Sequence, residues 1–354
     1  MPETQKCRRT RHVLSYVVCM DVPVIPFTLG SNALAMQTRF ANRFNCLIGP
    51  QIELYVFLLI SRKFAIISSM SDPEYKPAPQ SIPNQIGAEI PYDGCPLCAG
   101  KESQLVQEAN CGQHPLWQPG LPTQLRWLCC NACSHVFRSA YFSPAAMKLL
   151  FSRAHACQVV GVEIDQQRAQ WADTVHRVNR LMPEPVWNGR AAVWVDIGCG
   201  NGGLVFTSAE FGFQAIGIDM RQAAVEQITA LGFNAIVGDI AEMMVTDPVD
   251  VISMADVLEH VPYPREALKR VFGSLKPEGV IVVSCPNYDC ASWRATSKAG
   301  TNPYWGEIEH FHNFSRASLM RLLAQEGFMP VDYQVSRRYK SCMEITAVRT
   351  DSCE

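Results

Sequence analysis

The stretch Val193-Trp-Val-Asp196-Ile-Gly198-Cys-Gly200-Asn-Gly-Gly203 decides the fold of this chain of 354 residues. An apolar, β-branched run meets a burst of glycines there, and a segment suited to a helix follows. This pattern predicts a tight strand-to-helix turn whose backbone a ligand can approach closely, because glycine has no Cβ. A second apolar run ends in Asp219, at the spacing expected of a carboxylate that accepts hydrogen bonds from ribose hydroxyls. The two features predict a site for an adenine nucleoside derivative.

Charge distinguishes between two such ligands. Gly198, Gly200 and Gly203 satisfy the dinucleotide pattern G-x-G-x-x-G, which by itself is a weak signal. Asp196 lies two residues before the first glycine, where it would repel a pyrophosphate at the following helix N-terminus. S-adenosylmethionine (SAM) carries no phosphate, and its sulfonium and ammonium groups favour a nearby acid. We therefore expect SAM rather than NAD.

Three segments resemble a known family. The run 196–202 resembles motif I of the class I SAM-dependent methyltransferases. Val257-Leu-Glu-His260-Val-Pro-Tyr-Pro264 resembles the segment after strand 4 in the subgroup that includes ubiquinone-biosynthesis O-methyltransferases, and 275–283 resembles that family's turn into strand 5. The resemblance covers residues from about 191 to 349 and is specific for the cofactor, not for the methyl acceptor. It implies a Rossmann-like α/β fold with a seven-stranded, mostly parallel sheet and an antiparallel last strand.

Alternating apolar strands and helical segments also argue for a parallel sheet. The expected strands lie near 193–197, 215–219, 234–238, 249–255 and 279–285, and the expected helices near 203–211, 222–232 and 264–275. A last helix near 316–327, capped by Ser315, precedes two strands at 329–335 and 342–348, which the resemblance makes an antiparallel hairpin. Two further helices are expected within 141–190, as a lid over the acceptor or as plain packing against the sheet.

The predicted cofactor site follows from the carboxyl ends of the strands, where open α/β sheets bind ligands. Asp219 is expected to accept from the ribose, with Met220 against the adenine. Asp239 is expected to accept from the adenine amino group or to cap a helix beginning at Ile240. Asp256 is expected to orient the cofactor backbone or a loop, or to act as a cap. The full predicted set is Asp196, Gly198, Cys199, Gly200, Gly202, Asp219, Met220, Asp239 and Asp256.

The methyl acceptor needs alignment with the sulfonium and, where it is a hydroxyl, a base. His260 follows strand 4 on the expected acceptor side, and a neutral imidazole could take the proton. Alternatively, Glu259 and His260 merely shape the loop before Pro262. His310 and His312 are further candidates for the base or the pocket wall. Their segment, 305–315, resembles the Glu-His-x-x-x-Phe-Ser segment after strand 5 of this superfamily, and its acids and histidines fit no standard helical metal site.

A second constellation precedes this region. Cys95-Pro-Leu-Cys98 and Cys130-Asn-Ala-Cys133 are two C-x-x-C pairs at a separation typical of zinc ribbons. We predict that Cys95, Cys98, Cys130 and Cys133 bind a structural Zn(II), since such a small module has little else to stabilise it. The alternative is four unligated, buried thiols. Three residues compete as ligands: Cys129, Cys111 and His114.

The predicted domains are 70–91, a Pro-rich linker; 92–140, the zinc-ribbon-like module; 141–190, the helical lid or linker; and 191–350, the methyltransferase domain. Residues 1–69 carry eight basic and three acidic residues. The polar restart at Met70 favours reading them as an extension that does not belong to the native protein.

Composition limits the function classes. A hydrophobic fraction of 48% and a net charge of −2 describe a globular protein without a general attraction to nucleic acid. No apolar run is long enough to span a bilayer, and fifteen cysteines outside a disulfide framework favour a cytoplasmic protein. We expect O- or C-methylation of a small molecule. A sugar C-methyltransferase, or a zinc-ribbon module that recognises a macromolecular partner, is the alternative; the ribbon's scarcity of Lys and Arg disfavours the latter. The oligomeric state stays open.

Overall fold

The computed structural model describes residues 89–351 except 154–159, 187–188, 241–246 and 340, and these residues fall within one compact unit, 60–354. The expectations for residues 1–69 and for nearly all of 70–91 lie outside the described residues. No helix in the described part of the chain is both long and apolar enough to cross a bilayer.

A seven-stranded sheet forms the larger part of the structure, in the order β12-β13-β10-β9-β6-β7-β8. Neighbouring strands run parallel except β13, which is antiparallel to both β10 and β12. This topology confirms the predicted Rossmann-like methyltransferase fold with an antiparallel last strand. The strands are β6 (Val193–Ile197), β7 (Gln214–Asp219), β8 (Asn234–Val237), β9 (Val249–Ala255), β10 (Leu275–Pro286), β12 (Phe328–Val335) and β13 (Cys342–Arg349).

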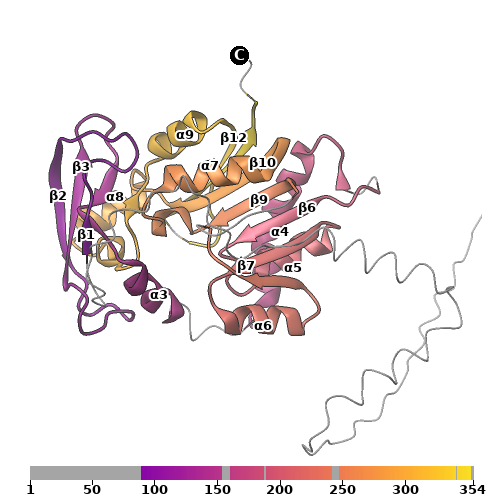
Figure 1. Cartoon of the computed structure of the whole chain (residues 1–354), viewed down its shortest axis with the longest axis horizontal. Coiled ribbons are helices and arrows are strands. Elements are labelled where there is room, and N and C mark those ends of the chain that lie inside the picture. The colour runs from indigo at the N-terminus through magenta and orange to yellow at the C-terminus, as the bar shows by residue number, and fades with distance from the viewer. Residues whose placement is uncertain (1–88, 154–159, 187–188, 241–246, 340, 352–354) are drawn as a thin grey trace, which may run out of the picture. The chain divides into compact units, whose positions relative to one another are not determined.

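Helices cover both faces of this sheet, and its central strands are therefore apolar at nearly every position. On one face Val195, Ile252 and Val283 join a core with α7 and α9, which Figure 1 shows on the same side. On the other face Trp194 and Val251 pack with α4. The helices are α3 (Pro144–Arg153), α4 (Ile164–Leu181), α5 (Gly203–Glu210), α6 (Gln222–Ala230), α7 (Pro264–Ser274), α8 (Ala291–Lys298) and α9 (Arg316–Gln325), with short 3-10 turns η2 (Leu258–His260) and η3 (Pro303–Gly306).

A smaller four-stranded sheet has the order β11-β4-β3-β2. Its strands are β2 (Ser103–Asn110), β3 (Gln124–Cys130), β4 (Val136–Arg138) and β11 (His312–Asn313), and a separate pair joins β1 (Glu89–Pro91) to β5 (Ala140–Phe142). Three strands belong to the predicted zinc-ribbon-like module, whereas β11 comes from the segment after β10. The sheet of the module thus extends into the catalytic half of the chain, which the sequence did not predict.

The predicted elements agree closely with the observed ones. Each predicted strand and helix of the large sheet is present, and all but one lie within about two residues of their predicted ends, the usual disagreement between assignments; β10 begins at Leu275, four residues before its predicted start. Ser315 caps α9, with its hydroxyl accepting from the Ser318 N–H at 3.0 Å. Ser143 accepts from the Ala146 N–H at the start of α3, as the Ser-Pro pattern predicts.

Candidate active site and cysteine cluster

The glycine turn after β6 is required by close packing. Gly198 and Gly202 adopt positive φ of 67° and 78°, which favours glycine. A Cβ on Gly198 would lie 2.5 Å from a methyl of Val257, and a Cβ on Gly202 would lie 2.7 Å from the ring of Phe206. The turn therefore holds its backbone against the segment after β9 and against α5. Its two glycines have no room for a side chain.

Asp219 connects this turn to the end of β7. Its carboxylate accepts from the Gly200 N–H at 2.8 Å and from the Arg221 N–H at 2.9 Å. The Arg221 guanidinium adds bonds of 3.0 Å from Nε and 3.3 Å from Nη2. These four bonds use the roughly four lone-pair directions of a carboxylate. A ribose hydroxyl can bind Asp219 only if one bond gives way, and the bond from Nη2 is the longest.

Asp196 is buried at the same edge of the sheet, with 3% of its surface exposed. One carboxylate oxygen accepts from Ser253 Oγ at 2.6 Å, and that hydroxyl accepts from Trp194 Nε1 at 2.8 Å. Burial raises the pKa of Asp196 to about 7, although Ser253 and Arg338 oppose the shift. The charge state of Asp196 near neutrality therefore depends on whether a cation lies beside it.

Three other predicted cofactor contacts differ in environment. Cys199 is buried and its Sγ packs on Gly217, so only its backbone is offered to a ligand. Met220 is 41% exposed beyond the end of β7, as an adenine contact would be. Asp239 is half-buried after β8, and the helix that it would cap lies outside the described residues.

Asp256 pairs with an arginine that the sequence did not single out. It adopts a positive φ of 56° after β9 and accepts from Arg338 Nη1 at 2.6 Å and from Ser284 Oγ at 3.1 Å. The Arg338 guanidinium lies 4.1 Å above the Trp171 ring of α4. Arg338 belongs to the connection between β12 and β13, and nothing local in its sequence indicates that it folds back to β9.

His260 lies at the end of η2, on the same edge of the sheet. Its Nδ1 is 3.1 Å from the carbonyl oxygen of Glu309. A carbonyl can only accept, so Nδ1 carries the proton and, in the neutral ring, Nε2 carries a lone pair. The His310 ring lies 4.7 Å away, edge to face, and Phe151 of α3 contacts His260 on another side at 5.4 Å.

Glu259 and His310 accompany His260 as buried polar groups. One carboxylate oxygen of Glu259 and one ring nitrogen from each histidine lie within 4.8 Å of one another. Neither carboxylate oxygen of Glu259, nor Nδ1 of His310, has a hydrogen-bond partner among the described residues. Burial raises the pKa of Glu259 well above its usual value, and burial lowers the pKa of His310. His310 is therefore neutral near pH 7, and burial favours the neutral form of Glu259. Sequence reasoning missed the burial of Glu259, which no local pattern shows.

His312 lies in a different environment from His260 and His310. Its Nε2 is 2.9 Å from the carbonyl oxygen of Val261, and its Nδ1 is 3.1 Å from Nε2 of His135. Burial lowers the pKa of His312 to about 4. Both ring nitrogens are engaged within the protein, which argues against His312 as the base and against a place in the pocket wall.

Glu307 and Glu309 meet His114 of the cysteine module. His114 Nε2 lies 2.9 Å from Glu307 and 3.7 Å from Glu309, and the Leu116 N–H donates to His114 Nδ1 at 3.2 Å. Because Nδ1 accepts, Nε2 carries the proton and offers no lone pair to a metal. Burial raises the pKa of Glu309 to about 7. The acids and histidines of 307–312 thus belong to three groups. Glu307 and Glu309 lie with His114, His310 lies with Glu259 and His260, and His312 lies with His135.

The four predicted metal ligands lie together. The Sγ atoms of Cys95 and Cys133 are 3.6 Å apart, those of Cys98 and Cys130 are 3.5 Å apart, and all four lie within 4.8 Å of one another. Of the rival ligands, Cys111 donates to the Pro122 carbonyl, Cys129 lies outside the group, and His114 binds the acids described above.

Two turns of equal geometry present these sulfurs. Cys95 N–H donates to Gly100 O and Ala99 N–H to Cys95 O, both at 2.8 Å. Cys130 repeats the pattern with His135 and Ser134, both at 2.9 Å. Ala99 and Ser134 have positive φ of 60° and 58°. Burial raises the pKa of Cys95 against the opposing backbone N–H bonds of its turn, whereas burial is outweighed at Cys130, where the backbone N–H bonds of the second turn help to lower the pKa.

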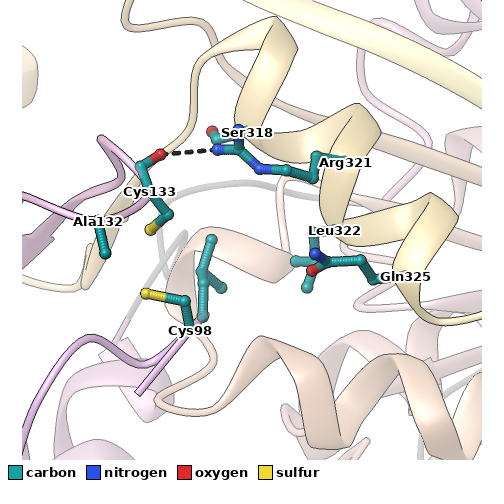
Figure 2. Close-up of a pocket in the computed structure, with 8 residues that line it drawn as sticks. Cys98, Ala132, Cys133, Ser318, Arg321, Leu322 and Gln325 are labelled. Carbon is teal, nitrogen blue, oxygen red and sulfur yellow. Dashed lines mark hydrogen bonds between the residues drawn. The ribbon is translucent and has the colours of Figure 1, made fainter. Parts of the chain in front are cut away.

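A pocket of about 230 Å³ separates this cluster from α9. Figure 2 shows Cys98 and Cys133 on one wall and Leu322 and Gln325 on the other, with Arg321 donating to the Cys133 carbonyl at 2.7 Å. This bond attaches the second cysteine turn to α9.

Residues 163–333 match the methyltransferase domain family. The match begins near the start of α4, earlier than the predicted domain start at 191. The chain is 32% identical over 107 residues to the ubiquinone biosynthesis O-methyltransferase of Idiomarina loihiensis, covering 28% of this chain and 44% of that protein. It is 30% identical over 133 residues to that of Pseudomonas fluorescens SBW25, covering 35% and 53%. The chain thus spans about half the length of the curated relatives it matches.

Solved structures with low similarity include two methyltransferases. Magnesium protoporphyrin IX methyltransferase from Synechocystis PCC 6803 with bound SAH is 19% identical, with a TM-score of 0.42, over 55% of this chain and 89% of that one. The 1,6-didemethyltoxoflavin-N1-methyltransferase of Burkholderia thailandensis is 18% identical, with a TM-score of 0.42, over 62% and 98%.

Proposed function

We propose that the chain transfers the methyl group of SAM to a small molecule whose accepting atom loses a proton, and that His260 takes this proton. The observation that carries the proposal is the orientation of the His260 ring. Its Nδ1–H donates to the Glu309 carbonyl, which fixes the tautomer and the orientation of the ring at the edge of the sheet that bears the glycine turn, so Nε2 is the nitrogen that would take the proton. The methyltransferase domain match supports the transfer of a methyl group, not the choice of base.

The residues of the cofactor edge fit SAM. When bound, SAM supplies an electrophilic methyl group on a sulfonium. The backbone of 198–202 is open to the methionine part because two of its glycines exclude side chains. Asp219 binds the ribose after partial release of Arg221, with Met220 and Asp239 beside the adenine. Asp196 and Asp256 place carboxylates near the two cationic groups, where a pyrophosphate would be repelled.

The acceptor side is enclosed by groups from distant parts of the chain. His260 and Glu259 come from η2, His310 comes from the segment before β11, and Phe151 comes from α3. In its protonated form, which burial favours, the Glu259 carboxyl can donate a hydrogen bond and so can orient an acceptor oxygen or either imidazole. Helices α3 and α4 place Phe151 beside His260 and Trp171 against Arg338, and we expect these rings to limit the access of water to this edge, as a lid would.

The four-cysteine cluster is proposed to hold Zn(II) in a structural role. Four thiolates complete a tetrahedral shell and leave no position open for substrate. The sulfur separations of 3.5 Å and 3.6 Å fit a common central ion, and the N–H groups of the two turns compensate the thiolate charge.

A small acceptor is favoured over a macromolecular one. Two edges of the cysteine module are engaged by the chain itself, since β11 pairs with β4 and α9 binds the second turn. The names of the relatives agree with a hydroxyl acceptor. In the alternative function, sugar C-methylation, His260 would remove the proton from an enolisable carbon.

The test is a product assay on purified full-length protein. Isotope-labelled SAM is supplied with matched phenolic, catecholic and keto-sugar acceptors, and transfer of label is measured against the His260→Ala variant. Label transfer to a small acceptor that depends on His260 supports the proposal. Transfer only to protein or nucleic acid in a cell extract would favour the macromolecular alternative. Binding of NAD in preference to SAM would overturn the cofactor assignment.

A further inference from the structure

The segment that carries His310 is held by the cysteine module. In the β11–β4 ladder, His312 pairs with Phe137 and Asn313 with Val136. The fully buried Arg138 donates to the Ile308 carbonyl at 2.9 Å through Nη1, and its N–H donates to Phe311 O at 2.9 Å. The module therefore positions the chain on both sides of His310.

A second connection leads from the module to the His260 loop. The His135 N–H donates to the Cys133 sulfur, and the His135 carbonyl accepts from the Cys130 N–H at 2.9 Å. The His135 ring reaches His312 at 3.1 Å, and His312 reaches the carbonyl of Val261, the residue after His260, at 2.9 Å. Two imidazoles thus join the second cysteine turn to the His260 loop.

The proton positions along this connection are determined. The Val261 carbonyl only accepts, so His312 Nε2 carries a proton, and burial keeps the ring neutral. His312 Nδ1 is then an acceptor, and His135 Nε2 must donate to it. Both rings are buried, His135 completely and His312 with 1% exposed, so water does not compete for these bonds.

We propose that His312 is a positioning residue that couples the cysteine module to the His260 ring. The proposal rests on the proposed role of His260. In it, the cysteine module helps to position the acceptor site and is not a separate binding unit. Without His312, the carbonyl of Val261 loses this bond, and the loop that orients His260 toward Glu309 loses the hydrogen bond nearest to the His260 backbone on its C-terminal side.

Imidazole ¹⁵N spectroscopy tests this coupling without an acceptor. The chain has eight histidines, so selectively ¹⁵N-labelled full-length protein gives an assignable set. In the wild type, His260 should show a single neutral tautomer protonated at Nδ1. His312→Phe preserves ring volume but removes both bonds, and should shift His260 to a mixture of tautomers. His312→Gln can donate to Val261 and accept from His135, and should restore the wild-type pattern.

A metal exchange tests the same coupling without any substitution. Replacing the bound ion by Cd(II), which is larger and also prefers thiolates, should shift the resonances of His135, His312 and His260 together. His176, exposed on α4, is the internal reference and should not shift. In the His312→Phe variant, Cd(II) should shift the resonances of His135 but not those of His260.

Two results would overturn the proposal. One is an unchanged His260 tautomer in folded His312→Phe protein; the other is a Cd(II)-induced shift of His260 that persists in that variant. If the melting curve shows that His312→Phe does not fold, the same measurements are made on His135→Phe, which removes only the bond between His135 and His312. None of these readouts needs SAM or turnover, so a failure of the methyltransferase assignment would leave the result on coupling intact.

Discussion

Nδ1 of His260 lies 3.1 Å from the carbonyl oxygen of Glu309, although the two residues are 49 positions apart in the chain. The contact joins the segment after β9 to the segment after β10. It decides which nitrogen of His260 is basic, and the first prediction depends on it.

His260→Ala should lower turnover by about 10²–10⁴-fold, the usual loss when a general base is removed, while SAM affinity changes little. His176→Ala, on the exposed face of α4, is the control for histidine removal. If the variant retains most of its rate, His260 is not the base. Substitution of His310 then distinguishes between a different base and a reaction that needs only alignment of the acceptor with SAM.

SAM affinity should depend on the charge of Asp196. Burial holds its pKa at about 7 in the free protein, whereas a bound sulfonium stabilises the carboxylate and lowers that pKa. Binding should therefore release a proton, and affinity should fall as pH drops below about 7, by up to about tenfold per pH unit. Calorimetry in buffers of different ionisation enthalpy measures this proton. Asp196→Asn, which can still accept from Ser253, should bind more weakly and without this pH dependence.

Asp219 and Arg221 should have opposite effects on SAM binding. Asp219→Ala removes an ionised acceptor and should weaken binding by about 1.5–3 kcal/mol. Arg221→Met removes the guanidinium that competes with the ribose for Asp219, and should tighten binding. Equilibrium dialysis with labelled SAM measures both. Weaker binding in Arg221→Met would mean that the guanidinium contacts the cofactor instead of competing with it.

The cysteine cluster should contain about one Zn(II) per chain by elemental analysis. Cys98→Ser should reduce metal content and lower the melting temperature, because the ion contributes folding free energy to the module. Cys129→Ser is the matched control: it alters the thiol next to Cys130 but lies outside the group of four. Metal-free protein with unchanged melting would refute the zinc site.

The sequence predicted the large sheet and the glycine turn at its edge, because both depend on local signals. Glycines at positive φ and strand ends that carry acids are visible in short windows, as are the two C-x-x-C pairs. Gly198 illustrates this: its conformation excludes other residues, so its identity alone predicts the turn.

Only the tertiary structure decided how His260, His310 and His312 divide their roles. All three occur in segments that the sequence marked, yet their hydrogen-bond partners differ: His260 bonds the Glu309 carbonyl, whereas His312 bonds His135 and the Val261 carbonyl. The pairing of β11 with β4 joins residues at least 175 positions apart in the chain. The bond from Arg338 to Asp256 joins residues 82 positions apart. Such contacts leave no periodic trace in the sequence, because they depend on how the strands and loops pack once the sheet has formed.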